Sequence, residues 1–230
     1  MRRLADPARA AGSQRYFRTA PGEYGAGDRF MGLDAAQIRR LAREFARLSL
    51  PEVEALLESP WHEARLLAVV LLANAYARAD ARAQAGIYRL YLRRTDRINN
   101  WDLVDASAPE VVGGHLLERS RAPLRKLARS QSVWERRIAV VATHHFIRRG
   151  DFDDTLRLAR LLMDDEHDLI HKAVGWMLRE VGKRDEHTLL GFLDRHASEL
   201  PRTALRYSIE RLTPGQRKRY MSAPRQSTKR

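Results

Sequence analysis

The run NNWDLVD at residues 99–105 combines the side chains of this sequence that are best suited to chemistry. Asn99 or Asn100 can cap a helix, and Trp101 and Asp105 then lie one turn apart on the same face. An aromatic ring beside a carboxylate suits a cationic target, because the ring offers its negative face and the carboxylate a full charge. The alternative is a core tryptophan, with Asp105 accepting hydrogen bonds at the helix end.

Two further segments bring basic and aromatic side chains together at helical spacing. Arg136 and Arg137 follow Trp134 at the start of a strongly apolar stretch, and Lys172 precedes Trp176 by one helical turn. A basic surface with interleaved aromatic rings suits a nucleic-acid backbone. The alternatives are tryptophans in the core and a solvated arginine pair.

The elements that must position these residues are helices. Apolar residues at 64, 67, 68, 71, 72 and 75 follow the spacing of a buried helix face, and no segment alternates long enough to predict a strand. Prolines stand near the expected helix starts. The pattern predicts helices at 35–47, 52–58, 62–78, 82–93, 100–107, 110–119, 123–129, 133–148, 152–163, 167–182, 186–196, 202–211 and 215–221.

Similar segments recur at a nearly constant spacing. Arg65, Trp101, Arg137 and Lys172 are separated by 36, 36 and 35 residues. A period of about 35–45 residues with two or three helices per repeat is typical of a HEAT-like array. We therefore predict an all-α fold, a HEAT-like repeat α-solenoid whose curved helical array has a long concave groove.

The same reading predicts one domain for nearly the whole chain. A length of 230 residues suits one large domain or two small ones. We expect a single HEAT-like repeat domain over 1–221, with a Gly-rich loop at 18–31. Residues 222–230 are polar and basic, and we expect a disordered tail there.

The charge balance favours a polyanionic partner. The chain has 42 Lys+Arg against 29 Asp+Glu, a formal net charge of +13. With the predicted fold, much of this surplus should line the concave face beside Trp101, Arg137 and Trp176.

Composition also excludes several classes of protein. There is no cysteine, which excludes a disulfide scaffold, an iron–sulfur protein and a thiol nucleophile, and which fits a reducing cytosol. The longest apolar run, at 66–73, is far shorter than the roughly 20 residues of a membrane span. We expect no secretion signal and no membrane partner, and a cytoplasmic protein that is nucleoid-associated when it binds DNA.

One histidine pair has the spacing of a metal site. His167 and His171 lie one helical turn apart, but the segment lacks the glutamate of a metalloprotease helix and no third ligand is apparent. We expect neither a metal nor a cofactor.

Separated motifs along the chain follow the order found in one known family. They read YFRT at 16–19, PGEYG at 21–25, FMG at 30–32, WDLVD at 101–105, WERRIA at 134–139 and KAVGWMLRE at 172–180. Through them the chain resembles the DNA alkylation repair glycosylase family (AlkD-like) from about residue 14 to about residue 212. The resemblance implies a HEAT-like solenoid that removes positively charged alkylated bases, such as 3-methyladenine and 7-methylguanine, from DNA.

The resemblance also implies roles for the residues that match the motifs. Asp105 matches the family's catalytic carboxylate. Trp101 and Trp176 match an aromatic pair that lies against the sugar–phosphate backbone of the lesion, and Arg137 matches a basic residue that contacts the phosphate there.

Further contacts with DNA are expected outside this central set. Arg179 resembles an additional phosphate contact, and Tyr16 matches a tyrosine of the first helices. Lys172 and Arg136, beside the matched residues, complete the candidate DNA-binding set.

Physical chemistry supports the implied reaction. A cationic alkylated base is a good leaving group, so no strong general acid is needed, and its departure builds positive charge on the deoxyribose. Asp105 would stabilise that charge and orient the attacking water. The resemblance further implies that the lesion need not be flipped into a base pocket.

These inferences together predict a monofunctional alkylpurine DNA glycosylase, a hydrolase that acts as a monomer on double-stranded DNA containing alkylated bases. Two alternatives stay open, a catalytically silent HEAT-like DNA-binding protein and a HEAT-like protein-interaction scaffold.

Overall fold

The structure, a computed structural model, describes residues 1–222 and builds them from helices. These residues contain no strand and a single isolated bridge, between Arg29 and Trp61. The predicted all-α helical-repeat fold is confirmed.

Packing divides the chain into two compact units, unit 1 (Met1–His115) and unit 2 (Leu116–Arg230). We describe each unit by itself. The single domain expected over 1–221 stays a prediction. Beyond Ser222, the tail expected at 222–230 lies outside the described residues.

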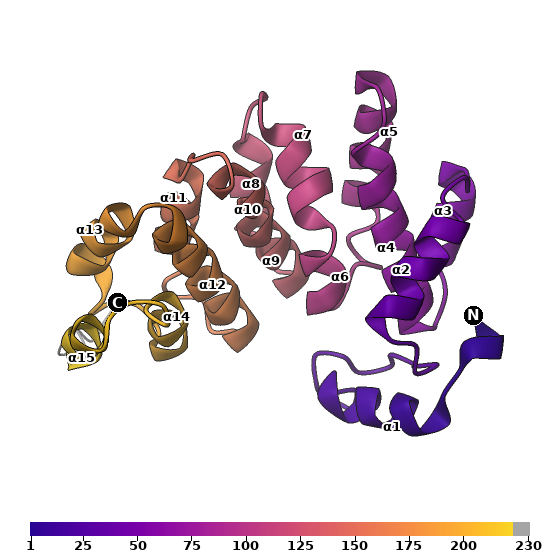
Figure 1. The fold of residues 1–230 in the computed structure, drawn as a ribbon, viewed down its shortest axis with the longest axis horizontal. Helices are drawn as coiled ribbons and strands as arrows, with labels where there is room; N and C mark the ends of the chain where they lie inside the picture. Colours follow the sequence, from indigo (N-terminus) through magenta and orange to yellow (C-terminus); the bar gives the residue numbers. More distant parts are fainter. Residues whose placement is uncertain (223–230) are drawn as a thin grey trace. The chain divides into compact units, whose positions relative to one another are not determined.

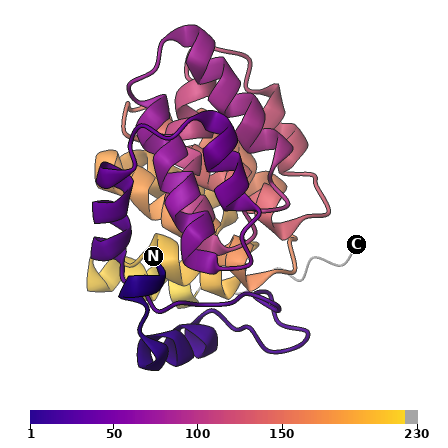
Figure 2. The same ribbon diagram turned by 90° about the vertical axis from the view of Figure 1, so that its right-hand side faces the viewer.

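Unit 1 is organised around one long apolar helix, α4. Helix α4 packs against α2, α3, α5, α6 and η2. All of these helices except η2 are labelled in Figure 1. In Figure 2 the indigo α1 and the loop after it lie below the other helices of the unit. The elements of unit 1 are η1 (Arg2–Leu4), α1 (Pro7–Tyr16), α2 (Ala35–Glu44), α3 (Leu50–Leu57), α4 (His62–Tyr76), α5 (Ala81–Arg93), α6 (Trp101–Asp105) and the π-helical η2 (Pro109–Gly113).

Unit 2 has the same plan around α12, which packs against α9, α10, α11, α13 and α14. Helix α7 (Gly114–Leu116) spans the boundary between the units. The elements of unit 2 are α8 (Ala122–Leu127), α9 (Val133–Ala142), α10 (His144–Ile147), α11 (Asp153–Leu161), α12 (Asp168–Arg184), α13 (Glu186–His196), α14 (Arg202–Ser208) and α15 (Pro214–Ser222).

The repeat spacing identified equivalent helix starts. Arg65, Trp101, Arg137 and Lys172 lie in the first or second turn of α4, α6, α9 and α12 respectively. The four residues at the repeat spacing therefore all lie near the start of a helix.

The N-terminal helix α1 was missed by the sequence prediction. Its start is encoded locally, because Asp6 accepts a hydrogen bond from the Arg9 amide at 3.0 Å and Pro7 occupies the first turn. The helix buries none of its residues, so it carries no apolar stripe for a periodicity search to find.

Two predicted helices are also divided differently in the structure. The helix expected at 110–119 is replaced by the π turn η2 and the short α7, since Pro109 has no N–H for an α-helical bond and two glycines follow. The helix expected at 133–148 breaks at Thr143, whose hydroxyl donates to the Val140 carbonyl at 2.7 Å.

The Gly-rich loop expected at 18–31 is present, and a buried carboxylate fixes its end. Glu63, in the first turn of α4, accepts hydrogen bonds from the amides of Met31 (2.9 Å), Gly32 (2.7 Å) and Leu33 (3.3 Å). Gly32 has a φ of +82°, and a Cβ there would lie 2.1 Å from the Asp6 carbonyl oxygen, so only glycine fits.

A pair of helical glycines in unit 2 tests how closely α12 and α14 pack. In Gly175→Ala, the new Cβ would lie 2.5 Å from the Ala204 carbonyl oxygen and 2.5 Å from Tyr207 Cβ. We expect the free energy of unfolding to fall by about 1–3 kcal/mol in urea denaturation. Gly191→Ala, in α13 with no atom within 4 Å of its Cβ, is the control and should raise it by about 0.5–1 kcal/mol. Equal effects of the two substitutions would contradict the close approach.

Candidate functional site

Helix α6 holds the predicted aromatic–carboxylate pair. Asn100 Oδ1 accepts a hydrogen bond from the Trp101 amide at 2.8 Å, so the predicted asparagine cap is confirmed at Asn100. Trp101 and Asp105 are the first and last residues of the helix, and both are half-buried. The structure therefore brings this pair together on one helical turn, as the spacing predicted.

A buried imidazole lies behind this helix and bridges two carboxylates. His62 Nδ1 is 3.0 Å from Asp28 Oδ2, and His62 Nε2 is 2.8 Å from Asp102 Oδ2. Arg65 and Asn100 also donate to Asp28, at 2.6 Å and 3.2 Å. The His62 side chain is only 2% exposed. We call these five residues the α6 anchor.

The charges of the α6 anchor compensate one another. Burial lowers the pKa of His62, but hydrogen bonds and charge from Asp102 and Asp28 outweigh it and raise the pKa from 6.5 to about 9. Burial raises the pKa of Asp28, but its hydrogen bond to His62 and the Arg65 charge outweigh that, so the pKa is lowered. At neutral pH two cations thus face two carboxylates, which is how ionised groups are accommodated in a protein interior.

An aromatic cluster covers the anchor and supports Trp101. The Phe17 ring stacks on Trp101, with centroids 5.2 Å apart and planes at 17°, and on Phe30, at 5.1 Å and 19°. Phe17 and Phe30 both contact the His62 ring, at 4.8 Å and 4.6 Å between centroids. Tyr16 meets Trp101 edge to face at 5.8 Å, and Tyr16 is 67% exposed. Tyr16, a predicted DNA contact, is therefore placed beside a predicted site residue.

The anchor was missed by sequence reasoning, although a signal was present. His62, Glu63 and Arg65 are ionisable residues in the first turns of a long apolar helix, and each is at most 3% exposed. Polar groups in a buried helix need partners, so this cluster predicts a polar network. The sequence does not show that the partners would be Asp28 and Asp102, which lie 34 and 40 residues away.

In unit 2, the predicted arginine pair of α9 is largely held by the protein itself. Arg137 is 5% exposed and donates from Nη1 to the Leu169 carbonyl at 2.6 Å. Arg136 forms a two-point contact with Asp165, at 2.6 Å and 3.3 Å, and donates to the Ser130 carbonyl at 3.0 Å. The geometry gives Arg136 a structural role at the start of α9, and the DNA contacts of both arginines stay predictions.

Trp176, on α12, is half-buried and has polar neighbours. Its Nε1 donates to Glu180 Oε1 at 3.2 Å, and its ring lies 5.9 Å from the His144 ring at an angle of 45°. Glu180 also accepts a hydrogen bond from Lys183 Nζ at 2.7 Å. This carboxylate fixes the edge of the indole, while the role of Trp176 at the lesion stays a prediction.

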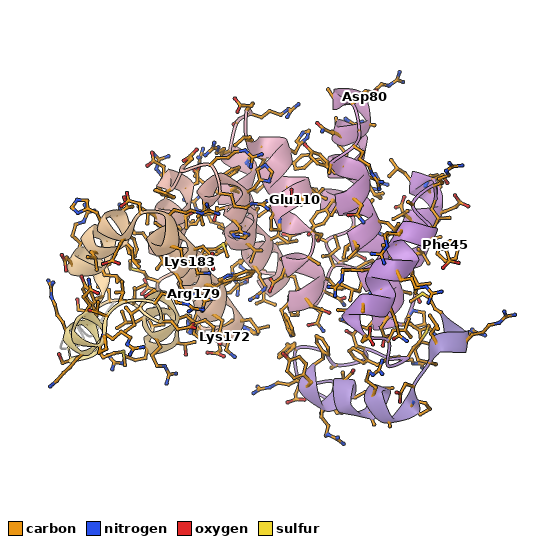
Figure 3. The ribbon with its side chains drawn as sticks, viewed as in Figure 1. Phe45, Asp80, Glu110, Lys172, Arg179 and Lys183 are labelled. Carbon is orange, nitrogen blue, oxygen red and sulfur yellow. The ribbon has the colours of Figure 1, made fainter. Side chains whose placement is uncertain are left out.

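The remaining predicted DNA contacts, Lys172 and Arg179, also lie on α12 (Figure 3). Lys172 Nζ is 2.8 Å from Asp168 Oδ2, and its side chain is 40% exposed. Arg179 Nη1 donates to Glu210, whose side chain is half-exposed. The Lys172 pair faces solvent and is therefore weak, so a phosphate can compete for this cation, whereas the Arg179 side chain is only 19% exposed.

The two histidines at metal-site spacing, His167 and His171, bond to backbone groups in the part of the chain that the structure describes. His167 Nδ1 accepts from the Leu169 amide at 3.2 Å, and His171 Nε2 bonds the Asp165 carbonyl. Over residues 1–222, no group of three or more His, Cys, Asp or Glu side chains could hold a metal ion.

Over the same residues, every helix is too short or too polar to cross a bilayer.

Comparison with known proteins places the chain in a family. The family model described as DNA alkylation repair enzyme matches residues 1–212. A solved structure titled "Predicted DNA alkylation repair enzyme from Enterococcus faecalis" is similar to the chain, with a TM-score of 0.70 and 18% identity over 92% of this chain and 98% of that one. No curated protein matches the chain. Because the family model spans nearly the whole sequence, the chain belongs to the DNA alkylation repair enzyme family.

Proposed function

We propose that this protein is a monofunctional DNA glycosylase that hydrolyses the N-glycosidic bond of cationic alkylated purines, such as 3-methyladenine and 7-methylguanine, in duplex DNA. The proposal rests on one arrangement. In a chain of the DNA alkylation repair family, Trp101 and Asp105 lie one turn apart on a helix that a buried charge network anchors.

The α6 pair fits the charge that develops in this reaction. The base leaves with its electrons, so positive charge accumulates on the deoxyribose. The Asp105 carboxylate stabilises that charge and orients the attacking water, and the negative face of Trp101 favours the same cation. Because the alkylated base is already cationic, no general acid and no cofactor are needed.

Unit 2 supplies the binding charge. It contains 25 Lys+Arg and 15 Asp+Glu, whereas unit 1 contains 17 and 14. Lys172 and Arg179 exchange their carboxylate partners for phosphates, while Trp176 and Arg137 hold the backbone of the lesion. Backbone contacts of this kind give affinity without sequence preference, which suits an enzyme that must find lesions anywhere. We expect it to act as a cytoplasmic monomer that associates with the nucleoid.

The decisive experiment is base release. The purified protein should liberate 3-methyladenine or 7-methylguanine from methylated duplex DNA, as measured by chromatography against enzyme-free DNA, and should leave the strand intact. Binding to the DNA without release of either base would refute the glycosylase proposal and favour a silent DNA-binding protein.

Asp105→Asn keeps the shape of the side chain and removes its charge. We expect the single-turnover rate of base release to fall by about 100-fold or more, because the sugar cation loses its stabilising charge. Asp96→Asn is the matched control, since that side chain is 64% exposed and lies 3.5 Å from Arg94, and it should keep the wild-type rate. A wild-type rate in Asp105→Asn would place the catalytic charge elsewhere.

Lys172→Ala tests the phosphate contact on α12. We expect weaker binding to duplexes of any sequence, and a plot of log affinity against log salt whose slope is smaller by about 1. Arg157→Ala removes an exposed cation of α11 that pairs with Asp153 and should leave the slope unchanged. Equal salt-dependence slopes for the two variants would show that Lys172 does not contact the DNA phosphates.

A further inference from the structure

We propose that His62 is a positioning residue of the α6 site: while protonated, it joins Asp28 of the Gly-rich loop to Asp102 of α6 and thereby fixes where Trp101 and Asp105 lie. This inference rests on the proposed function, in which Trp101 and Asp105 face the reacting sugar, because only then does their position affect base release.

The bridge itself requires the protonated ring. A carboxylate oxygen only accepts hydrogen bonds, and both ring nitrogens of His62 lie within 3.0 Å of one. A neutral imidazole has one N–H, so it can donate to one of the two aspartates and must turn a lone pair toward the other. In a buried site this contact is repulsive. Loss of the proton therefore breaks one of the two links.

Loss of either link reaches α6. Asp102 lies in the first turn of α6, and its remaining hydrogen bond, from the Leu103 amide at 2.9 Å, lies within its own helix. Asp28 accepts a hydrogen bond at 3.2 Å from Asn100, which caps the same helix. The carboxylate that faces the lone pair of the neutral ring is repelled, and α6 loses one of its fixed contacts with α4.

Helix α6 depends on such side-chain links because it is very short. It has five residues, too few for a helix to be stable by its own backbone hydrogen bonds. Asn100 caps its start, and Asp102 ties its first turn to His62. The same imidazole packs against Phe17, on which the Trp101 ring stacks. His62 thus supports Trp101 through both the backbone of α6 and the aromatic cluster.

The surroundings of His62 determine the direction of the pH dependence. Asp28 faces it from the loop, Asp102 from α6 and Arg65 from α4, and the rings of Phe17 and Phe30 cover it. The pKa of His62 is raised from 6.5 to about 9 in the folded protein. Its stabilising effect is therefore complete below pH 6.5 and is lost as the pH rises through about 9.

The first test reports on the position of Trp101 and does not require a measurement of enzyme activity. The protein is labelled with 5-fluorotryptophan, and the Trp101 ¹⁹F resonance is assigned with Trp101→Phe. We expect this resonance to shift with a midpoint near the pKa of His62, about 9, and the midpoint to vanish in His62→Gln. His115→Gln is the matched control, since His115 is also buried in unit 1 but stacks on Tyr88, and it should keep the titration.

The second test reads the consequence for base release. The wild-type single-turnover rate should fall above about pH 9. In His62→Gln it should already be lower by about tenfold at neutral pH, since a small displacement of the reacting groups costs this much, and it should not fall further. Asp102→Asn leaves the Asp28 contact of His62 in place and should show the same loss. Affinity for undamaged duplex should change by less than about twofold in both variants, since the α12 cations are untouched.

The outcomes separate the two proposals. A Trp101 resonance that does not titrate, or that titrates equally in His62→Gln, overturns the positioning role whatever the activity. A high-pH loss of base release that persists in His62→Gln also overturns it. Absence of base release from the wild type, with the ¹⁹F titration present and dependent on His62, refutes the glycosylase proposal and supports the anchoring role.

Discussion

The site in unit 1 depends on one buried ionic bridge, in which His62 lies between Asp28 and Asp102. It connects three segments that are far apart in sequence, the loop after α1, the start of α4 and the short helix α6. Charges buried in this way are tolerated only as a compensated set, because removal of one partner leaves the other unpaired in a medium that solvates it poorly. The bridge is therefore a constraint on geometry more than a source of stability, and it specifies where α6 lies.

The first turn of α4 also fixes the end of the Gly-rich loop through a second carboxylate, that of Glu63. Glu63 accepts hydrogen bonds from three successive amides, of Met31, Gly32 and Leu33. Its neighbour His62 binds Asp28 a few residues earlier in the loop. Because α4 packs against most of unit 1, a loop tied twice to its first turn is fixed relative to the core of that unit. The loop needs this support, since its glycines give it little preference for one conformation.

Local spacing predicted what is local, and the contacts between distant residues were found only in the structure. Trp101 and Asp105 could be paired from the sequence because a helix fixes the i, i+4 relation, and the Asn100 cap adjoins the same helix. No period links Asp28 to His62, so the partners of the buried ionisable residues of α4 could not be identified from the sequence. Arg136 shows the same limit, because its sequence position gives no sign of Asp165, 29 residues away, which engages its guanidinium. Helix α1, with a cap but no buried face, was missed for lack of an apolar pattern.

The division of charge between the units bears on a conflict in what the proposed base-release chemistry requires. Binding DNA requires a surplus of cations, but a cationic base and a developing sugar cation are both repelled by one. Unit 1 carries 17 basic against 14 acidic residues, and the α6 anchor is neutral as a set. Unit 2, with 25 against 15, carries most of the surplus. In the proposed reaction, the carboxylate that stabilises the sugar cation therefore belongs to the unit with the smaller basic surplus.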